Sequence, residues 1–339
     1  HPERGSAMSF AYHNLRSGAS AQRSDDQFAQ AVLKGLSNTP KHLPSWLIFD
    51  DRGSEIFTEI MELSGYHPAQ CEFEIFHTHK QVITDLLSKE CFKLIELGAG
   101  DGRKTMVLLE HFIQSHLKFT YVPIDISEGA IKNIIASLEK KFSGNALEVK
   151  GLAADYFDGL AAIDENPQQR NIVLFLGSTI GNMRLPEAEQ FLRKLHAMLN
   201  DGDYVMIGFD LMKHPKILYS AYNDPTGLFE KFNLHLLDII NDKLGADIAT
   251  HHYVQQGQYN PRTHAVESYL YSTRRQVVSI DALGKKFYFD AWEPIQTEHS
   301  YKYTQHEIKA LAANSGYDTV EHLFDANNYF VDSVWKVKK

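Results

Sequence analysis

Apolar and polar residues follow one another along the middle of the chain in two distinct patterns. Short, almost wholly apolar runs predict strands that are buried on both faces, and longer stretches with apolar residues at helical spacing predict amphipathic helices. The predicted strands are Phe92–Leu97, Phe119–Ile126, Leu147–Ala153, Asn171–Leu176 and Tyr204–Phe209, and the predicted helices are Arg103–Phe119, Glu128–Phe142 and Pro186–Leu199. This alternation predicts an α/β fold with a doubly wound parallel sheet.

The segments on either side of this alternation follow other patterns. The segment before it is helical, with predicted helices at Phe28–Leu36, Ser54–Leu63 and Glu72–Leu87. Residues 215–244 are mostly helical, and period-two strands are then expected at Val266–Tyr271, Arg275–Ile280 and Lys286–Phe289, which indicates an inserted antiparallel lid. Near the end, Thr304 to Glu307 form a capping box that predicts a further helix, followed by strands at Tyr317–Leu323 and Phe330–Val337.

The length of 339 residues exceeds the usual size of a single domain. We therefore predict a nucleotide-binding type of domain formed by residues 76–210 and 301–339, and a second, α+β domain formed by residues 9–75 and 211–300. Residues 1–8, in which His1–Ala7 precede Met8, are predicted to be the remnant of an expression tag.

Composition and charge narrow the choice of partners. A net charge of -9 without any block of Lys and Arg argues against a nucleic-acid surface. The longest apolar runs fall far short of the roughly 20 residues that span a bilayer, so we expect no membrane segment. Two cysteines, Cys71 and Cys91, fit a reducing compartment, and no secretory signal precedes the fold, so we expect a cytoplasmic protein. We also expect a monomer.

The segment Glu96–Gly102 carries three glycines at the turn where the first buried strand passes into a helix. Such a turn suits either a dinucleotide or S-adenosylmethionine, because both present an adenosine across the carboxyl ends of the strands. A dinucleotide fingerprint requires a further glycine three positions after Gly100, where its pyrophosphate meets the helix N-terminus, but this chain has Arg103 there. The spacing G-x-G-x-G is typical of class I methyltransferases, whose donor has no phosphate.

Polar residues at the ends of the next two strands support an adenosine ligand. Asp125 ends the second strand and is the expected partner of the ribose hydroxyls. Asp155 and Tyr156 follow the third strand, where a carboxylate can accept a hydrogen bond from the adenine amino group and a ring can stack on the base. His251-His252 and His77-x-His79 suggest a metal, but no Cys/His constellation accompanies them, so we predict no metal site.

Several separated motifs carry a more specific resemblance. They are Phe49-Asp50-Asp51-Arg52-Gly53-Ser54, Tyr66-His67-Pro68, Glu96–Gly100 with Lys104, Phe175–Asn182 and Thr297-Glu298-His299-Ser300. On these motifs, from about Leu36 to the C-terminus, the chain resembles the histidine-specific, S-adenosylmethionine-dependent Nα-methyltransferases of ergothioneine biosynthesis and their relatives that act on other aromatic amino acids. The resemblance implies a Rossmann-like class I methyltransferase domain with a second, α+β substrate-binding domain.

The resemblance also assigns residues. The donor S-adenosylmethionine, which leaves as S-adenosylhomocysteine, would contact Gly98, Lys104, Asp125, Asp155 and Tyr156, with Lys104 pairing with the methionyl carboxylate. The amino-acid substrate would contact Phe49, Tyr66, Gly177, Asn182, Tyr222, Glu298 and Ser300. Of these, Asn182 and Tyr222 would hold the carboxylate and the amine, and Glu298 and Ser300 would bond the imidazole nitrogens. Tyr66, Asn182 and Tyr222 are the implied catalytic residues.

The implied reaction adds methyl groups to the α-amino group of histidine, up to the trimethylated betaine hercynine. The proton that the amine loses could pass to water or to the Tyr66 hydroxyl. Members that make the trimethyl product usually have tyrosine where this chain has Phe49, and a hydrophobic residue of the ring pocket corresponds to Ser268. Phe49 therefore leaves the number of transferred methyl groups open. Ser268 leaves the ring pocket open to another acceptor, such as a tryptophan-type or modified histidine amino acid. A non-catalytic sensor of the cofactor or the amino acid is a further alternative.

Overall fold

The computed structural model describes residues 9–16, 19–87, 90–142, 144, 147–166 and 168–339. Residues 1–8, which the sequence predicts to be a tag remnant, lie outside the described residues. The chain divides into two compact units. Among the described residues, the first unit comprises residues 9–16, 68–211 and 303–339, and the second comprises residues 19–67 and 212–302.

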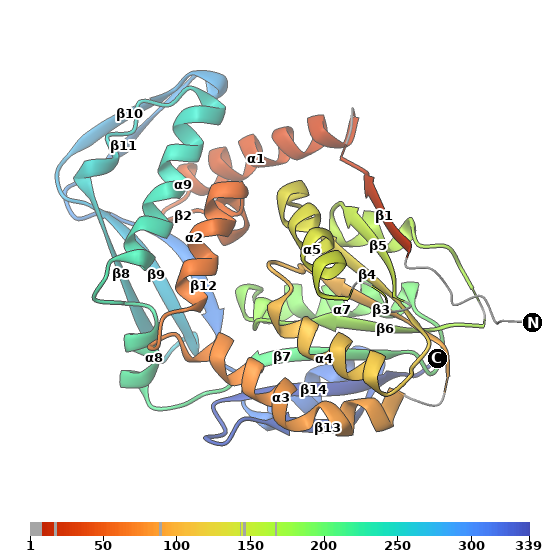
Figure 1. Ribbon diagram of the computed structural model, residues 1–339. Coiled ribbons are helices and arrows are strands. Elements are labelled where there is room, and N and C mark those ends of the chain that lie inside the picture. Colours follow the sequence, from red (N-terminus) through yellow and green to blue (C-terminus); the bar gives the residue numbers. More distant parts are fainter. Residues whose placement is uncertain (1–8, 17–18, 88–89, 143, 145–146, 167) are drawn as a thin grey trace, which may run out of the picture. The chain divides into compact units, whose positions relative to one another are not determined.

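The first unit is built on an eight-stranded sheet with the order β1-β5-β4-β3-β6-β7-β14-β13 (Figure 1). Its strands are β1 (Ser9–Asn14), β3 (Phe92–Leu97), β4 (Phe119–Asp125), β5 (Glu148–Ala153), β6 (Arg170–Phe175), β7 (Tyr204–Asp210), β13 (Tyr317–Phe324) and β14 (Phe330–Val337). Strands β1 and β3 to β7 pair in parallel, whereas β14 runs antiparallel to both of its neighbours. The sequence prediction of an α/β doubly wound sheet is confirmed.

The order of the strands fixes the edge of the sheet at which a ligand is expected. From β3 the chain moves to β4 and β5 on one side, and then returns to β6 and β7 on the other side. The direction of winding therefore reverses between β3 and β6. In open α/β sheets, ligands bind outside the carboxyl ends of the strands at such a switch point.

Helices cover both faces of this sheet. On one face, α3 (His67–Leu87), α4 (Arg103–Gln114) and α5 (Glu128–Lys141) pack against the apolar side chains of the central strands. On the opposite face, α6 (Tyr156–Ala161) and α7 (Leu185–Met198) pack against Phe175 of β6, and α10 (Gln305–Asn314) contacts β13. The Thr304 capping box at the start of α10 is confirmed. Helix α4 ends earlier than predicted because His116 turns the chain with a φ of 56°.

The second unit combines helices with a sheet that is antiparallel except for the parallel pairing of β2 with β12. Its helices are α1 (Ala19–Ser37), α2 (Asp51–Met61), α8 (Pro215–Ala221) and α9 (Leu228–Leu244). Its sheet has the order β2-β12-β9-β8, with β2 (Lys41–His42), β8 (Tyr253–Asn260), β9 (Ala265–Ser272) and β12 (Pro294–Tyr301). Strands β10 (Gln276–Ile280) and β11 (Lys285–Phe289) form a separate hairpin. The antiparallel strands expected from the period-two pattern are present.

Two bounds of the structural units differ from the predicted domain bounds. The predicted second domain included residues 9–75, but residues 9–14 form β1 and pair with β5 of the first unit. The first unit also resumes at Pro68, so most of α3 belongs to it. Strand β1 was not predicted from the sequence, because it is a short edge strand without a buried apolar face.

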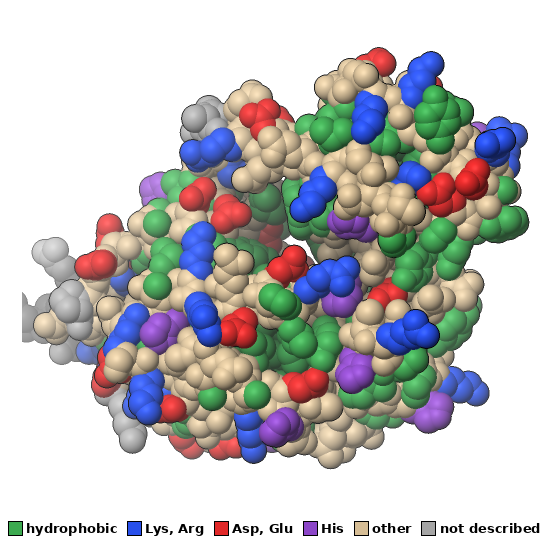
Figure 2. Space-filling model, turned by 180° about the vertical axis from the view of Figure 1, so that it is seen from behind, with side chains coloured by type: hydrophobic (Ala, Val, Ile, Leu, Met, Phe, Trp, Pro, Cys, Tyr) green, Lys and Arg blue, Asp and Glu red, His purple; other side chains and the backbone are tan. Residues whose placement is uncertain are grey.

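Surface and helix properties add two observations. Figure 2 shows acidic and basic side chains interspersed over the face in view, without a broad basic area among the residues described there. In the described part of the chain, none of the helices is both long enough and apolar enough to cross a bilayer.

Candidate active site

The glycine turn after β3 forms a backbone cradle at the carboxyl end of the sheet. Gly98, Gly100 and Gly102 all have positive φ angles, of 73°, 56° and 71°, which favour glycine. A Cβ atom on Gly98 would lie 3.0 Å from the hydroxyl oxygen of Tyr156, whereas the space beside Gly100 is open. The turn therefore offers exposed backbone to a ligand next to Tyr156.

Glu96, at the end of β3, anchors this turn from inside the protein. Its carboxylate accepts hydrogen bonds from Thr105 of α4, at 2.7 Å, and from Tyr121 of β4. Burial raises the pKa of Glu96 from 4.5 to about 7, against the lowering effect of these two hydrogen bonds. Because the side chain is 3% exposed, Glu96 supports the strand and helix on either side of the turn and does not face solvent.

Asp125 occupies the position predicted for the ribose partner. One of its carboxylate oxygens accepts from the amide of Gly100, at 3.0 Å, and the other from the amide of Ser127, at 2.8 Å. The side chain thus joins the glycine turn to the start of α5. Its place at the end of β4, beside the cradle, suits a hydroxyl-bearing ligand.

Asp155 and Tyr156 lie at the start of α6, one strand further along the sheet. Asp155 is the N-cap of α6, accepts from the amide of Phe157 at 3.1 Å, and is exposed. The ring of Tyr156 makes edge contacts with Phe175 and Phe191, with centroids 5.8 and 6.3 Å away. Burial, with the nearby charges of Asp125 and Asp155, raises the pKa of Tyr156. The Tyr156 hydroxyl therefore stays protonated as it faces the cradle.

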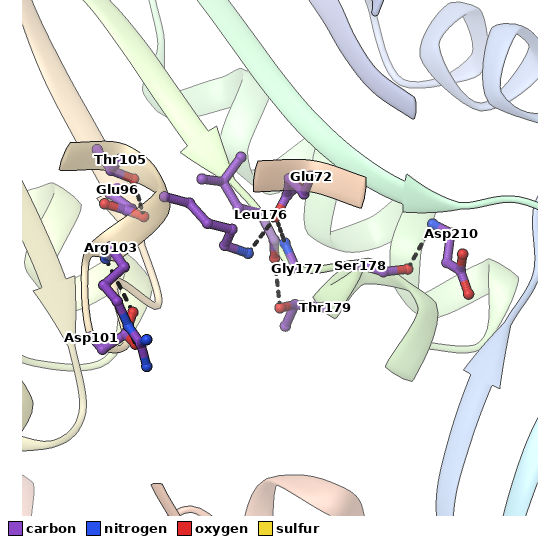
Figure 3. A network of polar contacts seen from close by, with 11 residues as sticks. Glu72, Glu96, Asp101, Arg103, Thr105, Leu176, Gly177, Ser178, Thr179 and Asp210 are labelled. Atoms are coloured by element: carbon purple, nitrogen blue, oxygen red, sulfur yellow. Dashed lines mark hydrogen bonds and ion pairs between the residues drawn. The ribbon is translucent and has the colours of Figure 1, made fainter. Parts of the chain in front are cut away.

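Lys104, the second residue of α4, is engaged by a buried carboxylate of α3. Its ammonium donates to Oε1 of Glu72, which also accepts from the amide of Gly177 at 2.8 Å. Figure 3 shows Glu72 directed toward Gly177 at the end of β6. Burial lowers the pKa of Lys104, but Glu72, Asp332 and Glu96 together oppose it and the net direction is upward. Lys104 therefore keeps its positive charge at the switch point.

A second buried carboxyl group, that of Asp332 on β14, faces Glu72. Both residues are fully buried. Burial first, and then the charge of Glu72 and a hydrogen bond to it, raise the pKa of Asp332 well above its ordinary value. Because two buried carboxyl groups in contact cannot both ionise readily, a proton held on Asp332 links it to Glu72. Gly208 of β7 makes room for this pair, since a Cβ atom there would lie 2.1 Å from Oε2 of Glu72.

The segment after β6 carries Gly177 and Asn182. Gly177 has a φ of 72° and is followed by Ser178, which also has a positive φ, of 56°. The Ser178 hydroxyl accepts from the amide of Asp210 at 2.9 Å, which holds the segment against the end of β7 (Figure 3). The turn then forms a short 3₁₀ helix, η2 (Thr179–Asn182), with Asn182 exposed at its end.

The aromatic residues predicted to contact the substrate form one cluster in the second unit. Tyr66 contacts Tyr222 with a centroid distance of 6.1 Å, and both contact Phe229 of α9, at 5.7 and 5.4 Å. Phe49 lies at the other end of this cluster and contacts Phe232 at 5.6 Å. Tyr66 and Tyr222 are 7% and 6% exposed, so their rings form a largely buried aromatic wall.

Glu298 and Ser300 project from the same side of β12, as the alternation of a strand requires. A bulge between Gln296 and Glu298 precedes them, so the alternation is undisturbed between the two. Asn233 of α9 donates to Oε2 of Glu298 at 3.3 Å, and Ser268 pairs with Glu298 across the strands and hydrogen-bonds it. Burial raises the pKa of Glu298, and these two hydrogen bonds and the charge of Lys302 oppose the shift.

Ser300 is part of a buried polar network. Its hydroxyl accepts from the Tyr222 hydroxyl at 3.1 Å and from the ammonium of Lys302 at 2.9 Å. Lys302 also donates to the Tyr222 hydroxyl at 2.8 Å. Each of the two hydroxyl groups predicted to meet the substrate is therefore held by the same lysine.

The sequence analysis did not identify four of these residues, which are Glu72, Asn233, Lys302 and Asp332. Asp332 gave a signal, because with Ser333 it interrupts a largely apolar stretch of β14. Lys302 lies two residues after the end of the Thr297–Ser300 motif, which was a second available signal. Among the described residues, no group of three His, Cys, Asp or Glu side chains is placed to hold a metal.

The residues at the carboxyl edge of the first unit fit a phosphate-free adenosine ligand with a carboxylate. The open backbone at Gly100 and the carboxylates of Asp125 and Asp155 suit the hydroxyls and amine of an adenosine, and Lys104 supplies a positive charge. Arg103, which stands where a dinucleotide fingerprint requires glycine, pairs with Asp101 at the helix start (Figure 3).

Comparison with known proteins agrees with this geometry. The sequence profile of a family described as "Histidine-specific methyltransferase, SAM-dependent" matches residues 28–337. A histidine N-alpha-methyltransferase of Mycobacterium tuberculosis is 32% identical over 285 residues, which cover 84% of this chain and 87% of that protein. One of Mycolicibacterium smegmatis is 31% identical over 303 residues, which cover 89% and 92%.

A relative that is named for a different substrate is also similar. The 4-dimethylallyltryptophan N-methyltransferase easF of Claviceps purpurea is 27% identical over 208 residues, which cover 58% of this chain and 59% of that protein. With the family profile extending over nearly the whole chain, this protein belongs to the histidine-specific, S-adenosylmethionine-dependent methyltransferases.

Proposed function

We propose that the protein transfers methyl groups from S-adenosylmethionine to the α-amino group of L-histidine, up to the trimethylated betaine. The observation that carries this proposal is the pair Glu298 and Ser300 on one side of β12, each fixed by its own polar partners. A carboxylate and a hydroxyl side by side match the two nitrogens of one imidazole ring. A site of this kind penalises ligands that leave its polar groups unpaired.

The donor would be held by Gly98, Lys104, Asp125, Asp155 and Tyr156. When bound, S-adenosylmethionine supplies a methyl group on a positively charged sulfonium. Lys104 would bind its carboxylate while Glu72 holds the lysine in place. Asp125 would accept hydrogen bonds from the ribose hydroxyls and keep those from the amides of Gly100 and Ser127, since a carboxylate accepts several hydrogen bonds.

The acceptor would be oriented by the remaining predicted residues. Asn182 and Tyr222 would hold its carboxylate and amine, and Gly177 would leave room for the backbone of the amino acid. Methyl transfer requires alignment and an uncharged amine, and a strong base is not needed. The proton released with each methyl group passes to water or to the Tyr66 hydroxyl. The rings of Phe49, Tyr66 and Tyr222 would stabilise the final quaternary ammonium through cation–π contacts.

A second candidate acceptor is a tryptophan-type amino acid or a modified histidine. Two observations favour it. Ser268 and Phe49 are the two departures from the family pattern. Ser268 lies beside Glu298 and places a hydroxyl near the expected ring site, where the family has a hydrophobic residue. The relative from Claviceps purpurea is named for a substituted tryptophan.

The experiment is a methylation assay on the purified protein with S-adenosylmethionine and each of histidine, its Nα-methyl and Nα,Nα-dimethyl forms, and tryptophan, followed by mass spectrometry. We expect stepwise addition of methyl groups to histidine. The variant Glu298→Ala should lose roughly 10- to 100-fold in kcat/KM for histidine. Glu59→Ala, an exposed change on α2, is the matched control and should keep full activity. Preferred turnover of tryptophan by the unmodified protein would overturn histidine as the acceptor.

A further inference from the structure

Lys302 is a buried cation among the groups that face the expected acceptor. It follows β12 directly, and it is 1% exposed. Its ammonium lies 2.8 Å from the Tyr222 hydroxyl and 2.9 Å from the Ser300 hydroxyl, and 4.9 Å from the centre of the Tyr222 ring. A lysine is almost never fully buried unless its ammonium is paired, so the hydrogen bonds to these two hydroxyl groups help to explain why Lys302 is buried here.

The hydrogen bonds around Lys302 impose a direction on the two hydroxyl groups. An ammonium has three donors and no acceptor, so both hydroxyl oxygens must accept from it. Tyr222 then donates its own proton to Ser300, at 3.1 Å. The Ser300 oxygen therefore accepts twice, which uses both of its lone pairs. Its own O–H group is the part of Ser300 left to contact a ligand.

Glu298 has the opposite polarity. An ionised carboxylate only accepts hydrogen bonds, and Asn233 and Ser268 hold this one in position without using all of its lone pairs. The strand therefore presents an acceptor at Glu298 and a donor at Ser300. A neutral imidazole has one N–H group and one unprotonated nitrogen, which complements this arrangement. An indole lacks the unprotonated nitrogen, and an imidazolium has two N–H groups.

We propose that Lys302 is a positioning residue that fixes Ser300 as a hydrogen-bond donor, so that the site selects a ring with one N–H group and one unprotonated nitrogen. This inference rests on the proposed function, because it assumes that Glu298 and Ser300 meet the ring of the substrate. In this role Lys302 acts through Ser300 and Tyr222, to which its ammonium donates.

The test compares histidine with a pyrrolyl analogue of it, in which a C–H group replaces the unprotonated ring nitrogen. With the analogue, the Ser300 proton has no partner in the unmodified protein, at a cost that corresponds to roughly tenfold or more in kcat/KM. In Lys302→Met the ammonium no longer donates to the two hydroxyl oxygens, so the hydrogen bond between them can reverse and the Tyr222 oxygen can accept that proton. We therefore expect the preference for histidine over the analogue to fall about tenfold in this variant.

Several controls separate the possible outcomes. Lys231→Met, an exposed change on α9, should keep the unmodified preference. Ser300→Ala should reduce the preference by itself, and adding Lys302→Met to it should change the preference no further.

If Lys302 only supports the fold, Lys302→Met lowers kcat/KM for both substrates equally and the inference is wrong. Should Lys302→Met not fold, Lys302→Gln offers an oxygen to the Ser300 proton, and the same fall in preference is expected. Absence of any histidine methylation by the unmodified protein would instead refute the proposed function.

Discussion

Replacement of Glu96 by glutamine tests how the glycine turn is supported. Glu96 is buried between β3, β4 and α4, and its carboxylate accepts from Thr105 and Tyr121. Glutamine has the same shape and can keep both hydrogen bonds, but it cannot ionise. The variant Glu96→Gln therefore removes the charge and leaves the packing in place.

The size of the effect follows from the pKa of this group. An ordinary glutamate has a pKa of 4.5, and burial raises the pKa of Glu96 to about 7. The native state therefore binds more protons than the unfolded state between these two values, and the free energy of unfolding falls as the pH rises through this window. At about 1.4 kcal/mol per pH unit, the raised pKa corresponds to a loss of about 3 kcal/mol above pH 7. Glu96→Gln lacks this loss.

The assay is urea unfolding at several pH values between about 4.5 and 8. Trp335 is fully buried in the first unit, whereas Trp46 and Trp292 are exposed in the second. With Trp46 and Trp292 replaced by phenylalanine, fluorescence reports on the first unit alone. The unmodified background and Glu96→Gln should be similarly stable near pH 4.5, and the variant should be more stable by about 3 kcal/mol at pH 8.

An exposed change provides the control for this comparison. Glu139→Gln, on the exposed side of α5, should follow the unmodified background at every pH. The reasoning is refuted if the stability difference between Glu96→Gln and the background stays constant over the whole pH range. A constant difference would mean that Glu96 has the same charge in the native and unfolded states.

Three further changes test other parts of the site. Gly98→Ala should weaken the binding of S-adenosylmethionine, measured by calorimetry, because the added Cβ would lie 3.0 Å from the Tyr156 hydroxyl. It should also lower the free energy of unfolding by about 1–2 kcal/mol, because Gly98 has a positive φ of 73°. The control is Gly227→Ala, at a φ of 77° with open space around it, which should lose the same stability but keep the affinity for the donor. Asp332→Asn should gain stability relative to the unmodified protein as the pH rises above 3.8, the ordinary pKa of aspartate, since burial beside a carboxylate raises the pKa of Asp332 and the native state then holds a proton that the unfolded state releases. A stability difference in urea unfolding that does not vary with pH would mean that Asp332 has the same pKa in the native and unfolded states. Burial raises the pKa of Glu298, so kcat/KM of the unmodified protein for histidine should fall as the pH is lowered through that pKa. The reference is Glu298→Gln, whose acceptor oxygen does not titrate. If the ratio of kcat/KM of the unmodified protein to that of Glu298→Gln does not vary with pH, Glu298 does not have this role.

Local pattern was sufficient to predict most secondary structure and the position of the glycine turn. Buried parallel strands such as Phe92–Leu97 appear as continuous apolar runs, and the three glycines that follow adopt positive φ angles, which glycine tolerates best. Asp125 and Asp155 could be assigned from sequence because the carboxyl end of each parallel strand lies at the same edge of the sheet. The motif resemblance supplied the family, which the family profile confirms.

The partners of these residues were decided only by the tertiary structure. Glu72 meets Lys104 and Asp332, and Asn233 meets Glu298, across separations in sequence that no local period encodes. Such pairs depend on which elements pack side by side in the fold. A buried polar or charged group needs a partner, and the packing decides which residue that partner is. The sequence by itself therefore determined the elements and the residue types of the site. The tertiary structure determined which carboxyl group keeps its proton and which hydroxyl donates, because both follow from burial and from neighbours distant in the chain.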